Sequence, residues 1–162
     1  MNNRPHPRPQ QHQERAQQAE AEYVVGFLFR ADLEEVVLIR KNRPAWQAGK
    51  INGIGGRVEL EETPPAAMTR EFHEEAGVLI QSWFHFRTEY FIHGTQAQVH
   101  YFAALASEKE WAALSTQTDE VLYILQLKNL PLITESLIYT LSYLIPMATV
   151  LLRQPIENIP AP

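Results

Sequence analysis

The sequence predicts an α/β fold in which helices cover the faces of one mixed β-sheet. The first indication is the order of its elements: two strand-like runs, one early helix, further strands and a late helix, without the regular alternation of a parallel fold. The second is size, because 162 residues of which 45% are hydrophobic can bury one sizeable core. We therefore expect a single domain over residues 23–153, with tails at 1–22 and 154–162.

The first part of this domain predicts two strands followed by a glycine-rich turn. Residues 23–30 (YVVGFLFR) and 36–40 (VVLIR) are β-branched and aromatic runs, which are typical of buried strands. The glycines within residues 49–56 permit positive φ angles and a close approach of the backbone to other groups.

A helix is predicted next, at residues 64–76. Thr63 is suited to the N-cap, and Pro64 is suited to the first helical position because its fixed φ angle is already helical. Gly77 ends the helix, since glycine readily takes the left-handed conformation of a C-terminal cap.

The second half of the chain predicts three strands and two helices. The strands are expected at residues 83–92, 96–106 and 121–127, and the helices at 108–114 and 132–152. The first two strands are joined by His-Gly-Thr, which indicates a hairpin. Pro146 is expected to disturb the long helix in its middle.

The composition of the termini and of the longest apolar stretch predicts where in the cell the protein is located. Residues 1–22 have too few apolar side chains to pack and no apolar core of a secretory signal, so they predict a mobile tail. Residues 130–152 are interrupted by Glu135 and Pro146, which predicts a buried helix and no membrane span. We therefore expect a cytoplasmic protein without a membrane partner.

Two numbers exclude whole classes of function. The sequence has no cysteine, which excludes disulfides, thiolate zinc sites and cysteine nucleophiles, so that any metal must have oxygen or nitrogen ligands. The formal net charge is -5, which gives no general attraction for a nucleic-acid backbone. A polymeric nucleic-acid partner is therefore not favoured.

Three carboxylates share one face of the predicted helix. Glu71, Glu74 and Glu75 are spaced at i, i+3 and i+4, which places them in one narrow sector. A neighbouring stripe is expected to pack on the sheet and consists of Met68, Phe72 and Ala76. Clustered carboxylates repel one another unless cations neutralise them, and Mg²⁺ or Mn²⁺ suits such an all-oxygen site. The alternative is an ordinary solvated helix face supported by i,i+4 ion pairs.

The residues around these carboxylates resemble the Nudix box. Residues 56–78 read GRVELEETPPAAMTREFHEEAGV, and the matching positions are Gly56, Glu62, Arg70, Glu71, Phe72, Glu74, Glu75, Gly77 and Val78. Phe72 stands where the family usually has an aliphatic residue, which affects packing only. The resemblance implies a Nudix-type α/β/α sandwich with a catalytic loop-helix-loop, and a hydrolase acting on phosphoanhydride bonds.

The resemblance also implies a role for each residue. The implied metal ligands are Glu71, Glu74 and Glu75, and the implied cofactor is Mg²⁺ or Mn²⁺. Arg70 and Glu62 would orient the loop and the carboxylates through charge-assisted hydrogen bonds. Gly55 or Gly56 would bring the backbone close to metal and substrate and complete the metal shell with a carbonyl. Glu120 stands where MutT-like members carry a further metal ligand or base, and its alternative is an ordinary acidic residue before a strand.

A second resemblance concerns the substrate. Residues 50–59 (KINGIGGRVE) resemble the KWNGxGGKVE form of MutT-like enzymes that hydrolyse nucleoside triphosphates, including oxidised purine nucleotides. It implies that Asn52 binds the base, with a turn-forming Asn-Gly as the alternative. Glu135 and Thr140 are the candidates for a second base-reading group.

Other side chains are weaker candidates. Trp46, Phe27 and Tyr101 are large enough to stack on a base, although core positions are more usual for aromatic residues. The histidines have no spacing typical of metal ligands, and we interpret them as surface or core residues; they are His73, His85, His93 and His100.

Three hypotheses follow for the function. The leading one is hydrolysis of a nucleoside triphosphate, with the oxidised purine deoxynucleotides as one candidate, to the monophosphate and pyrophosphate. Hydrolysis of ADP-ribose or a nucleotide sugar is the alternative among enzymes, and a non-catalytic nucleotide sensor is the alternative of another class. Many members of the family dimerise, so the resemblance also implies a homodimer as a candidate assembly.

Overall fold

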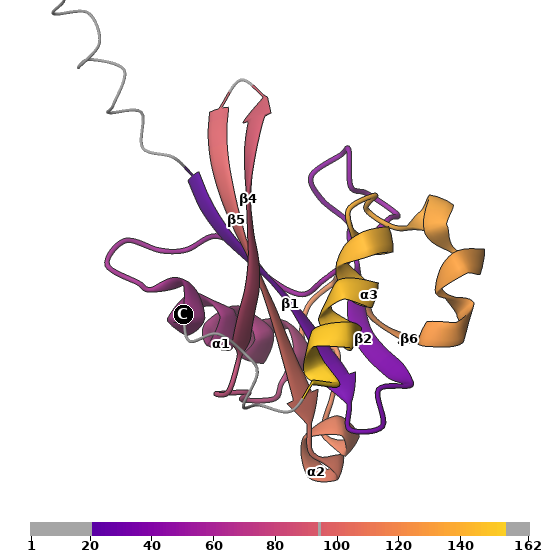
Figure 1. Cartoon of the computed structure of the whole chain (residues 1–162). Helices are drawn as coiled ribbons and strands as arrows, with labels where there is room; N and C mark the ends of the chain where they lie inside the picture. Colours follow the sequence, from indigo (N-terminus) through magenta and orange to yellow (C-terminus); the bar gives the residue numbers. More distant parts are fainter. Residues whose placement is uncertain (1–20, 94, 155–162) are drawn as a thin grey trace, which may run out of the picture.

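The computed structural model describes residues 21–93 and 95–154 (Figure 1). Its elements, in chain order, are β1 (Ala21–Arg30), β2 (Glu35–Arg40), β3 (Ile51–Asn52), α1 (Pro64–Ala76), β4 (Phe84–His93), β5 (Thr95–Ala106), α2 (Glu108–Ala112), β6 (Leu122–Gln126), two 3₁₀ helices, η2 (Leu127–Leu132) and η3 (Thr134–Ser136), and α3 (Leu141–Leu152). The two early strands, the hairpin strands and the short α2 helix therefore lie where the sequence predicts them.

The strands form one mixed sheet. Its order is β3-β2-β1-β5-β4, and β6 pairs with β2. Strands β1 and β5 run parallel, whereas the other pairs are antiparallel. Helix α1 covers one face of the sheet and α3 covers the other (Figure 1). The predicted α/β/α sandwich with a mixed sheet is confirmed.

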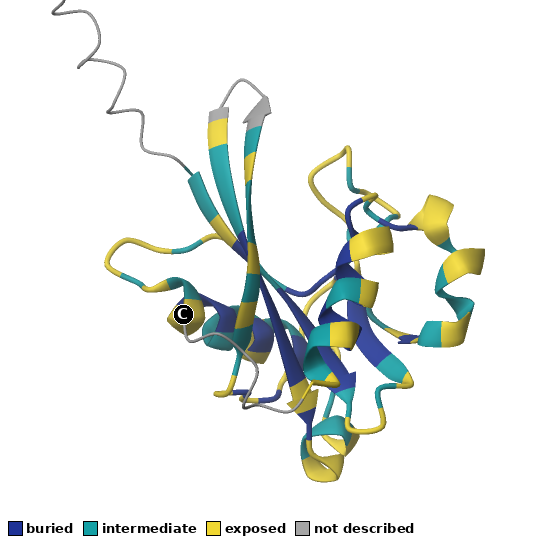
Figure 2. Ribbon diagram, viewed as in Figure 1, coloured by how far each residue is buried: buried dark blue, intermediate teal, exposed yellow. Residues whose placement is uncertain are grey.

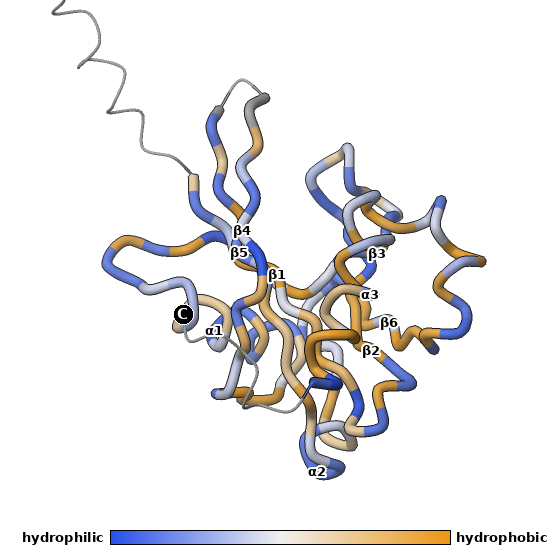
Figure 3. The backbone as a smooth tube through the Cα atoms, in the orientation of Figure 1, coloured by the Kyte–Doolittle hydropathy of each residue, from blue (hydrophilic) through white to orange (hydrophobic). Residues whose placement is uncertain are grey.

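Each face of the sheet has its own buried core (Figure 2). Because successive side chains of a strand point to opposite faces, β1 contributes to both cores. The core beneath α1 includes Val24, Leu28, Met68, Phe72 and Ala76. The core beneath α3 includes Phe27, Phe29, Leu141, Leu144 and Ile145. Figure 3 shows α3 as a largely hydrophobic segment, as expected for a helix that packs on a sheet.

The glycine-rich segment is inserted between two strands of the sheet. β1 and β2 pair only near Leu28 and Phe29, and beyond this point they separate. Residues 51 and 52 pair with β2, whereas residues 54 to 58 hydrogen-bond to β1 at Gly26, Val24 and Glu22. We call residues 51–58 the wedge segment. Both neighbouring strands thus fix its backbone.

Gly55 is the tightest point of the wedge segment. A Cβ atom at this position would lie 2.0 Å from the backbone oxygen of Val24. We expect Gly55→Ala to lower the free energy of unfolding by about 3 kcal/mol, because the clash involves backbone that cannot move aside. Gly49→Ala is the control: its φ of 82° is also positive and unfavourable for alanine, but a Cβ there meets no atom within 4 Å. The control should lose about 1 kcal/mol. Urea denaturation checks both values, and equal losses would contradict the close approach.

Helix α1 begins and ends where the sequence predicts. The Thr63 hydroxyl accepts a hydrogen bond from the amide of Ala66, and Pro64 occupies the first turn. Gly77 has a φ of 73° and donates its amide to the carbonyl of His73. Local signals alone therefore position this helix.

The prediction of one helix over residues 132–152 is wrong in its first nine residues. Residues 127–136 form 3₁₀ turns, and α3 starts only at Leu141. The reason is a tertiary contact: Leu137 bridges to Ile51 of β3, and the Ile138 amide donates to the Ile51 carbonyl at 2.9 Å. Pairing with a strand requires extended backbone, which interrupts the helix.

The predicted tails need one correction. Ala21 and Glu22 belong to β1, where they pair with residues 97 and 98 of β5, and are not part of a tail. The rest of the predicted N-terminal tail, residues 1–20, and residues 155–162 of the C-terminal tail lie outside the described residues. Within residues 21–93 and 95–154, no helix combines the length and the apolar character needed to cross a membrane.

Candidate active site

Helix α1 presents its three carboxylates to different degrees. The side chain of Glu71 is 15% exposed and that of Glu74 is 55% exposed, while Glu75 is half-buried. The neighbouring stripe of Met68, Phe72 and Ala76 is fully buried against the sheet. The acidic face thus lies at the edge of the core, as its spacing predicts.

Arg70 joins the helix to the loop that precedes it. Its Nε and Nη2 atoms donate to the two carboxylate oxygens of Glu62, each at 2.9 Å. Its Nη1 atom donates to Glu71 at 2.8 Å and to Glu74 at 3.2 Å. Nη2 also donates to the backbone oxygen of Arg57 at 3.0 Å. These hydrogen bonds lower the pKa of Glu62, and the role of Arg70 and Glu62 in orienting the carboxylates stays a prediction.

The backbone of the wedge segment lies directly against Glu71. A Cβ atom at Gly56 would fall 2.4 Å from the carboxylate carbon of Glu71, so only glycine allows this approach. Burial raises the pKa of Glu71, and the hydrogen bond from Arg70 opposes that rise. The Gly56 carbonyl accepts the amide of Val24 at 2.9 Å, which holds the loop in this position.

Glu75 carries a buried carboxylate oxygen that lacks a hydrogen-bond partner among the described residues. Burial raises the pKa of Glu75 to about 7, and the negative charges of Glu71 and Glu120 add to the rise. Lys41 and a hydrogen bond from the backbone of Gly55 act in the opposite direction. An unpartnered buried carboxylate beside another one is suited to a hard divalent cation.

The carboxylates are not gathered into a ready metal site. Over residues 21–93 and 95–154, no group of three or more His, Asp or Glu side chains is arranged to hold a metal ion. Arg70 engages oxygens of Glu71 and Glu74, which accounts for part of this arrangement. The oxygen donors of these carboxylates nevertheless fit a hard divalent ion.

Glu120 is buried just before β6 and points its carboxylate toward the end of β2. It accepts hydrogen bonds from Lys41 Nζ at 2.5 Å, the amide of Asn42 at 2.7 Å and the amide of Arg43 at 3.3 Å. Burial acts to raise the pKa of Glu120, but these donors outweigh it and the pKa is lowered. Its charge acts on Glu75, so the fold brings the two together. Its role as ligand or base stays a prediction.

Lys41 was missed in the sequence. It follows β2 directly, pairs with Glu120 and opposes the rise in the pKa of Glu75. The only signal available was a basic residue at the end of a buried strand, which is common.

The candidate base-binding residues lie around β3. The Asn52 amide donates to Gln47 at 3.1 Å and accepts from the amide of Gly53 at 2.8 Å. The bridge between Ile51 and Leu137 brings the region of Glu135 and Thr140 beside β3. Glu135 is exposed and its carbonyl accepts from Lys50 at 3.1 Å. Thr140 is buried. Their roles in binding stay predictions.

Two of the aromatic candidates are core residues. Phe27 and Tyr101 are buried and stack on each other, with ring centroids 6.5 Å apart. Trp46 is 68% exposed and remains accessible. Of the histidines, His100 is buried and bonded to Glu22, a contact between residues too distant in the chain for spacing to reveal.

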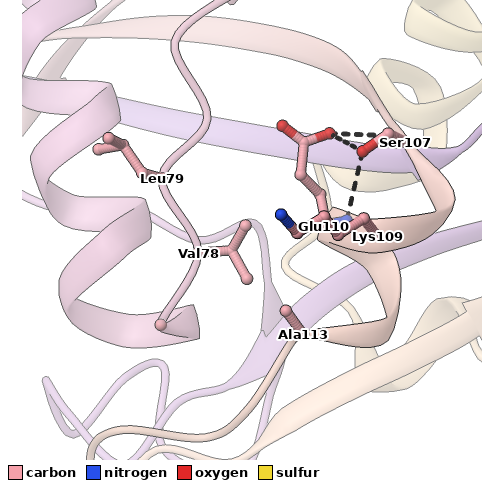
Figure 4. Close-up of a pocket in the computed structure, with 7 residues that line it drawn as sticks. Val78, Leu79, Ser107, Lys109, Glu110 and Ala113 are labelled. Atoms are coloured by element: carbon pink, nitrogen blue, oxygen red, sulfur yellow. Dashed lines mark hydrogen bonds between the residues drawn. The ribbon is translucent and has the colours of Figure 1, made fainter.

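A groove of about 380 Å³ lies between the end of α1 and α2 (Figure 4). Val78, Leu79, Lys109 and Ala113 line it. The carboxylate of Glu110 on its rim is engaged with the amide and hydroxyl of Ser107, as part of the α2 capping box. None of the α1 carboxylates lines the groove, so we assign it no part in the chemistry.

Comparisons with solved structures agree with this architecture. The NUDIX domain of Shewanella oneidensis NrtR, complexed with ADP ribose, has a TM-score of 0.65 at 18% identity, covering 88% of this chain and 94% of that one. The dihydroneopterin triphosphate pyrophosphohydrolase of E. coli has a TM-score of 0.61 at 17% identity, covering 80% and 94%. The MutT protein from Methanosarcina mazei Go1 has a TM-score of 0.63 at 16% identity, covering 83% and 96%. At these identities the likeness establishes the fold.

Comparisons of sequence identify the family. The 8-oxo-dGTP diphosphatase of Escherichia coli (strain K12) is 37% identical over 57 residues, which span 35% of this chain and 43% of that protein. A family model, the NUDIX domain, matches residues 20–135. That match includes the whole acidic helix and the loop before it. Because the model covers most of the chain, the chain belongs to the NUDIX domain family.

Proposed function

We propose that the protein is a hydrolase, dependent on Mg²⁺ or Mn²⁺, that cleaves a nucleoside triphosphate to the monophosphate and pyrophosphate. The observation that supports this most is a buried oxygen of Glu75 that has no hydrogen-bond partner within residues 21–93 and 95–154 and lies near Glu71 and the wedge segment. Such an oxygen favours a cation, and Glu75 would hold it near the glycine-rich backbone, which phosphates can approach.

Four carboxylates and one carbonyl would hold the ion: those of Glu71, Glu74, Glu75 and Glu120, and the carbonyl of Gly55. A bound divalent ion neutralises phosphate charge, polarises phosphorus and lowers the pKa of a bound water. Arg70 keeps Glu62 and Glu71 in fixed orientations. In this kind of reaction the protein contributes largely by holding the reacting groups in a fixed arrangement.

Glu120 is our candidate for the further ligand or base. Each carboxylate oxygen has two lone pairs, so Glu120 can accept an additional contact while Lys41 and Asn42 hold the side chain. Its lowered pKa keeps it ionised at neutral pH, as both roles require.

Residues 50–59 and the similarity to the E. coli 8-oxo-dGTP diphosphatase support a nucleoside triphosphate as substrate. A screen with Mg²⁺ tests this directly, using canonical and oxidised deoxynucleoside triphosphates, ADP-ribose, dinucleoside polyphosphates and nucleotide sugars. We expect pyrophosphate release from at least one triphosphate. Release from none of them would overturn the substrate assignment, and tight binding without turnover would favour a sensor.

Asn52 provides a separate prediction about the base. Asn52→Ala is expected to raise KM for the best nucleotide by about tenfold, with a small effect on kcat, because an amide that binds the base contributes equally before and during the reaction. Gln47→Ala is the control, since Gln47 only accepts a hydrogen bond from Asn52. Steady-state kinetics with purine and pyrimidine nucleotides check the result. An unchanged preference among bases would mean that Asn52 only stabilises the Asn-Gly turn and does not bind the base.

A further inference from the structure

A chain of hydrogen bonds lies on the α1 side of the sheet, away from the acidic residues. His100 of β5 is only 8% exposed, and its Nε2 atom is 2.5 Å from Glu22 Oε1. Its Nδ1 atom is 3.1 Å from the Thr88 hydroxyl, which is in turn 2.9 Å from His85 Nε2. The two imidazole rings lie 5.4 Å apart. Three strands, β1, β5 and β4, are thus linked by side chains.

The partners determine the direction of these bonds. A carboxylate only accepts, so the Nε2 atom of His100 must carry the proton and donate it to Glu22. In neutral His100 the Nδ1 atom then accepts from the Thr88 hydroxyl, whose oxygen accepts from His85. Because these bonds join side chains of three strands, they favour one arrangement of the strands.

Glu22 stands at the point where β1 meets the end of the wedge segment. Its backbone carbonyl accepts the amide of Val58 at 2.9 Å. Two residues further along β1, the amide of Val24 donates to Gly56 at 2.9 Å. His100 pairs with Val24 in the register between β5 and β1. The start of β1 thus has β5 along one edge and the wedge segment along the other. The His100–Glu22 bond fixes this stretch of β1 from the β5 side.

The contacts continue from there to the carboxylates. The residue before Val58 is Arg57, whose carbonyl accepts from Arg70, and Arg70 holds Glu71. Gly56 itself lies against the Glu71 carboxylate. A shift of the Glu22 end of β1 would move both groups relative to α1.

We propose that His100 and Glu22 are positioning residues, which hold the backbone of the wedge segment against the acidic face of α1. Only the expected effect on the reaction rate rests on the proposed function; the anchoring of the wedge segment does not. A misplacement of the order of 1 Å at a reacting site can reduce the rate strongly even when the fold is retained.

The test uses His100→Leu in the full chain. We expect amide exchange at Val58 and Val24 to become at least about tenfold faster, because both bonds depend on the anchored strand. We expect kcat to fall by about tenfold with KM within about twofold, and the Mg²⁺ concentration for half-maximal rate to rise. His100→Gln should recover most of the rate, since an amide N–H can still donate to Glu22.

Thr149→Ala is the matched control. Thr149 is also buried and polar, but its hydroxyl bonds to Ile145 within α3, on the other face of the sheet. The control should lose stability without faster exchange at Val58 and without a loss of kcat. Glu22→Gln provides a second variant at a more exposed position, with the same expected direction as His100→Leu and a smaller size.

The outcomes separate the two claims. No turnover by the unaltered protein would overturn the proposed function, while faster exchange at Val58 in His100→Leu would still support the anchoring of the wedge segment. Unchanged exchange at Val58 and unchanged kcat in folded His100→Leu and Glu22→Gln would overturn the inference alone. Exchange that rises equally across all helices and strands would also overturn it, because it would indicate only a less stable fold.

Discussion

Replacing Glu75 by Gln is expected to lower kcat on the order of 10³-fold while making the metal-free protein more stable at neutral pH. The two effects have one cause. One buried oxygen of the Glu75 carboxylate has no partner in the part of the chain that the structure describes, which disfavours the charged form unless a cation is bound. Glutamine has no charge to bury, and for the same reason it is a poor ligand for Mg²⁺.

The pKa of Glu75 predicts how the stability of the metal-free protein changes with pH. Burial raises the pKa of Glu75 from 4.5 to about 7 in the folded protein. A group with a raised folded pKa contributes its full stability below the unfolded pKa and loses it as pH rises through the folded pKa. The metal-free protein should therefore lose on the order of 3 kcal/mol from this group between pH 4.5 and pH 7. Urea denaturation across that range in EDTA should show the loss, and the Gln variant should not.

The control for Glu75 is Glu108→Gln. Glu108 is an exposed acidic residue in α2 whose ion pair with Arg30 is 3.5 Å long, so neither kcat nor the pH profile of stability should change. Added Mg²⁺ should stabilise the unaltered protein and the control, but should have much less effect on Glu75→Gln. A Glu75→Gln enzyme with unchanged kcat would show that the helix is not the metal site and that the proposed chemistry is wrong.

Arg70→Lys is expected to lower kcat by about a hundredfold and the free energy of unfolding by about 2 kcal/mol. Lysine keeps the positive charge, but it cannot reproduce the planar fork that holds both oxygens of Glu62 while also reaching Glu71 and the Arg57 carbonyl. The loop before α1 and the carboxylates on it would then no longer share one orientation. Steady-state kinetics and urea denaturation measure the two effects.

Arg87→Lys is the matched control for this substitution. Arg87 lies half-exposed on β4, and its Nε atom donates to Glu89 at 3.2 Å. Its replacement should change stability by less than about 0.5 kcal/mol and leave kcat unaffected. If Arg70→Lys also left kcat and stability nearly unchanged, the positive charge of Arg70 would be sufficient and its forked hydrogen bonds would not be required.

Elements with local signals were predicted correctly from the sequence. Helix α1 runs from Pro64 to Ala76 because Thr63 and Gly77 determine its ends within the segment itself. Its acidic face follows from helical periodicity, which requires no knowledge of the rest of the fold. The mixed sheet was predicted for a similar reason, since the hydrophobic strands are separated by clear turns.

Features that depend on distant contacts were not predictable. Residues 132–140 have an apolar pattern that suits a helix, but Leu137 is extended because it pairs with Ile51. Glu22 follows a polar stretch of the chain, and its place in the sheet depends on pairing with residue 98 of β5, far away in the sequence. In the same way, the pairing of Lys41 with Glu120 arises from the antiparallel approach of β2 and β6.

The candidate site itself was predicted in part. The orienting contacts of Arg70 with Glu62 are present, whereas Phe27 and Tyr101 stack within the core and cannot stack on a base. Chain composition does not distinguish an aromatic residue of a binding surface from one of the core. The difference depends on α3, which covers that face of the sheet.

The wedge segment has a consequence for the thermodynamics of ligand binding. Ordering the backbone of one residue costs about 1–2 kcal/mol in conformational entropy, and flexible phosphate-binding loops lose this freedom when the ligand arrives. Residues 51–58 are already ordered by hydrogen bonds to β1 and β2 when the sheet folds. Binding of the proposed triphosphate substrate would therefore not have to offset that loss, and more of its interaction free energy would be available to stabilise the transition state.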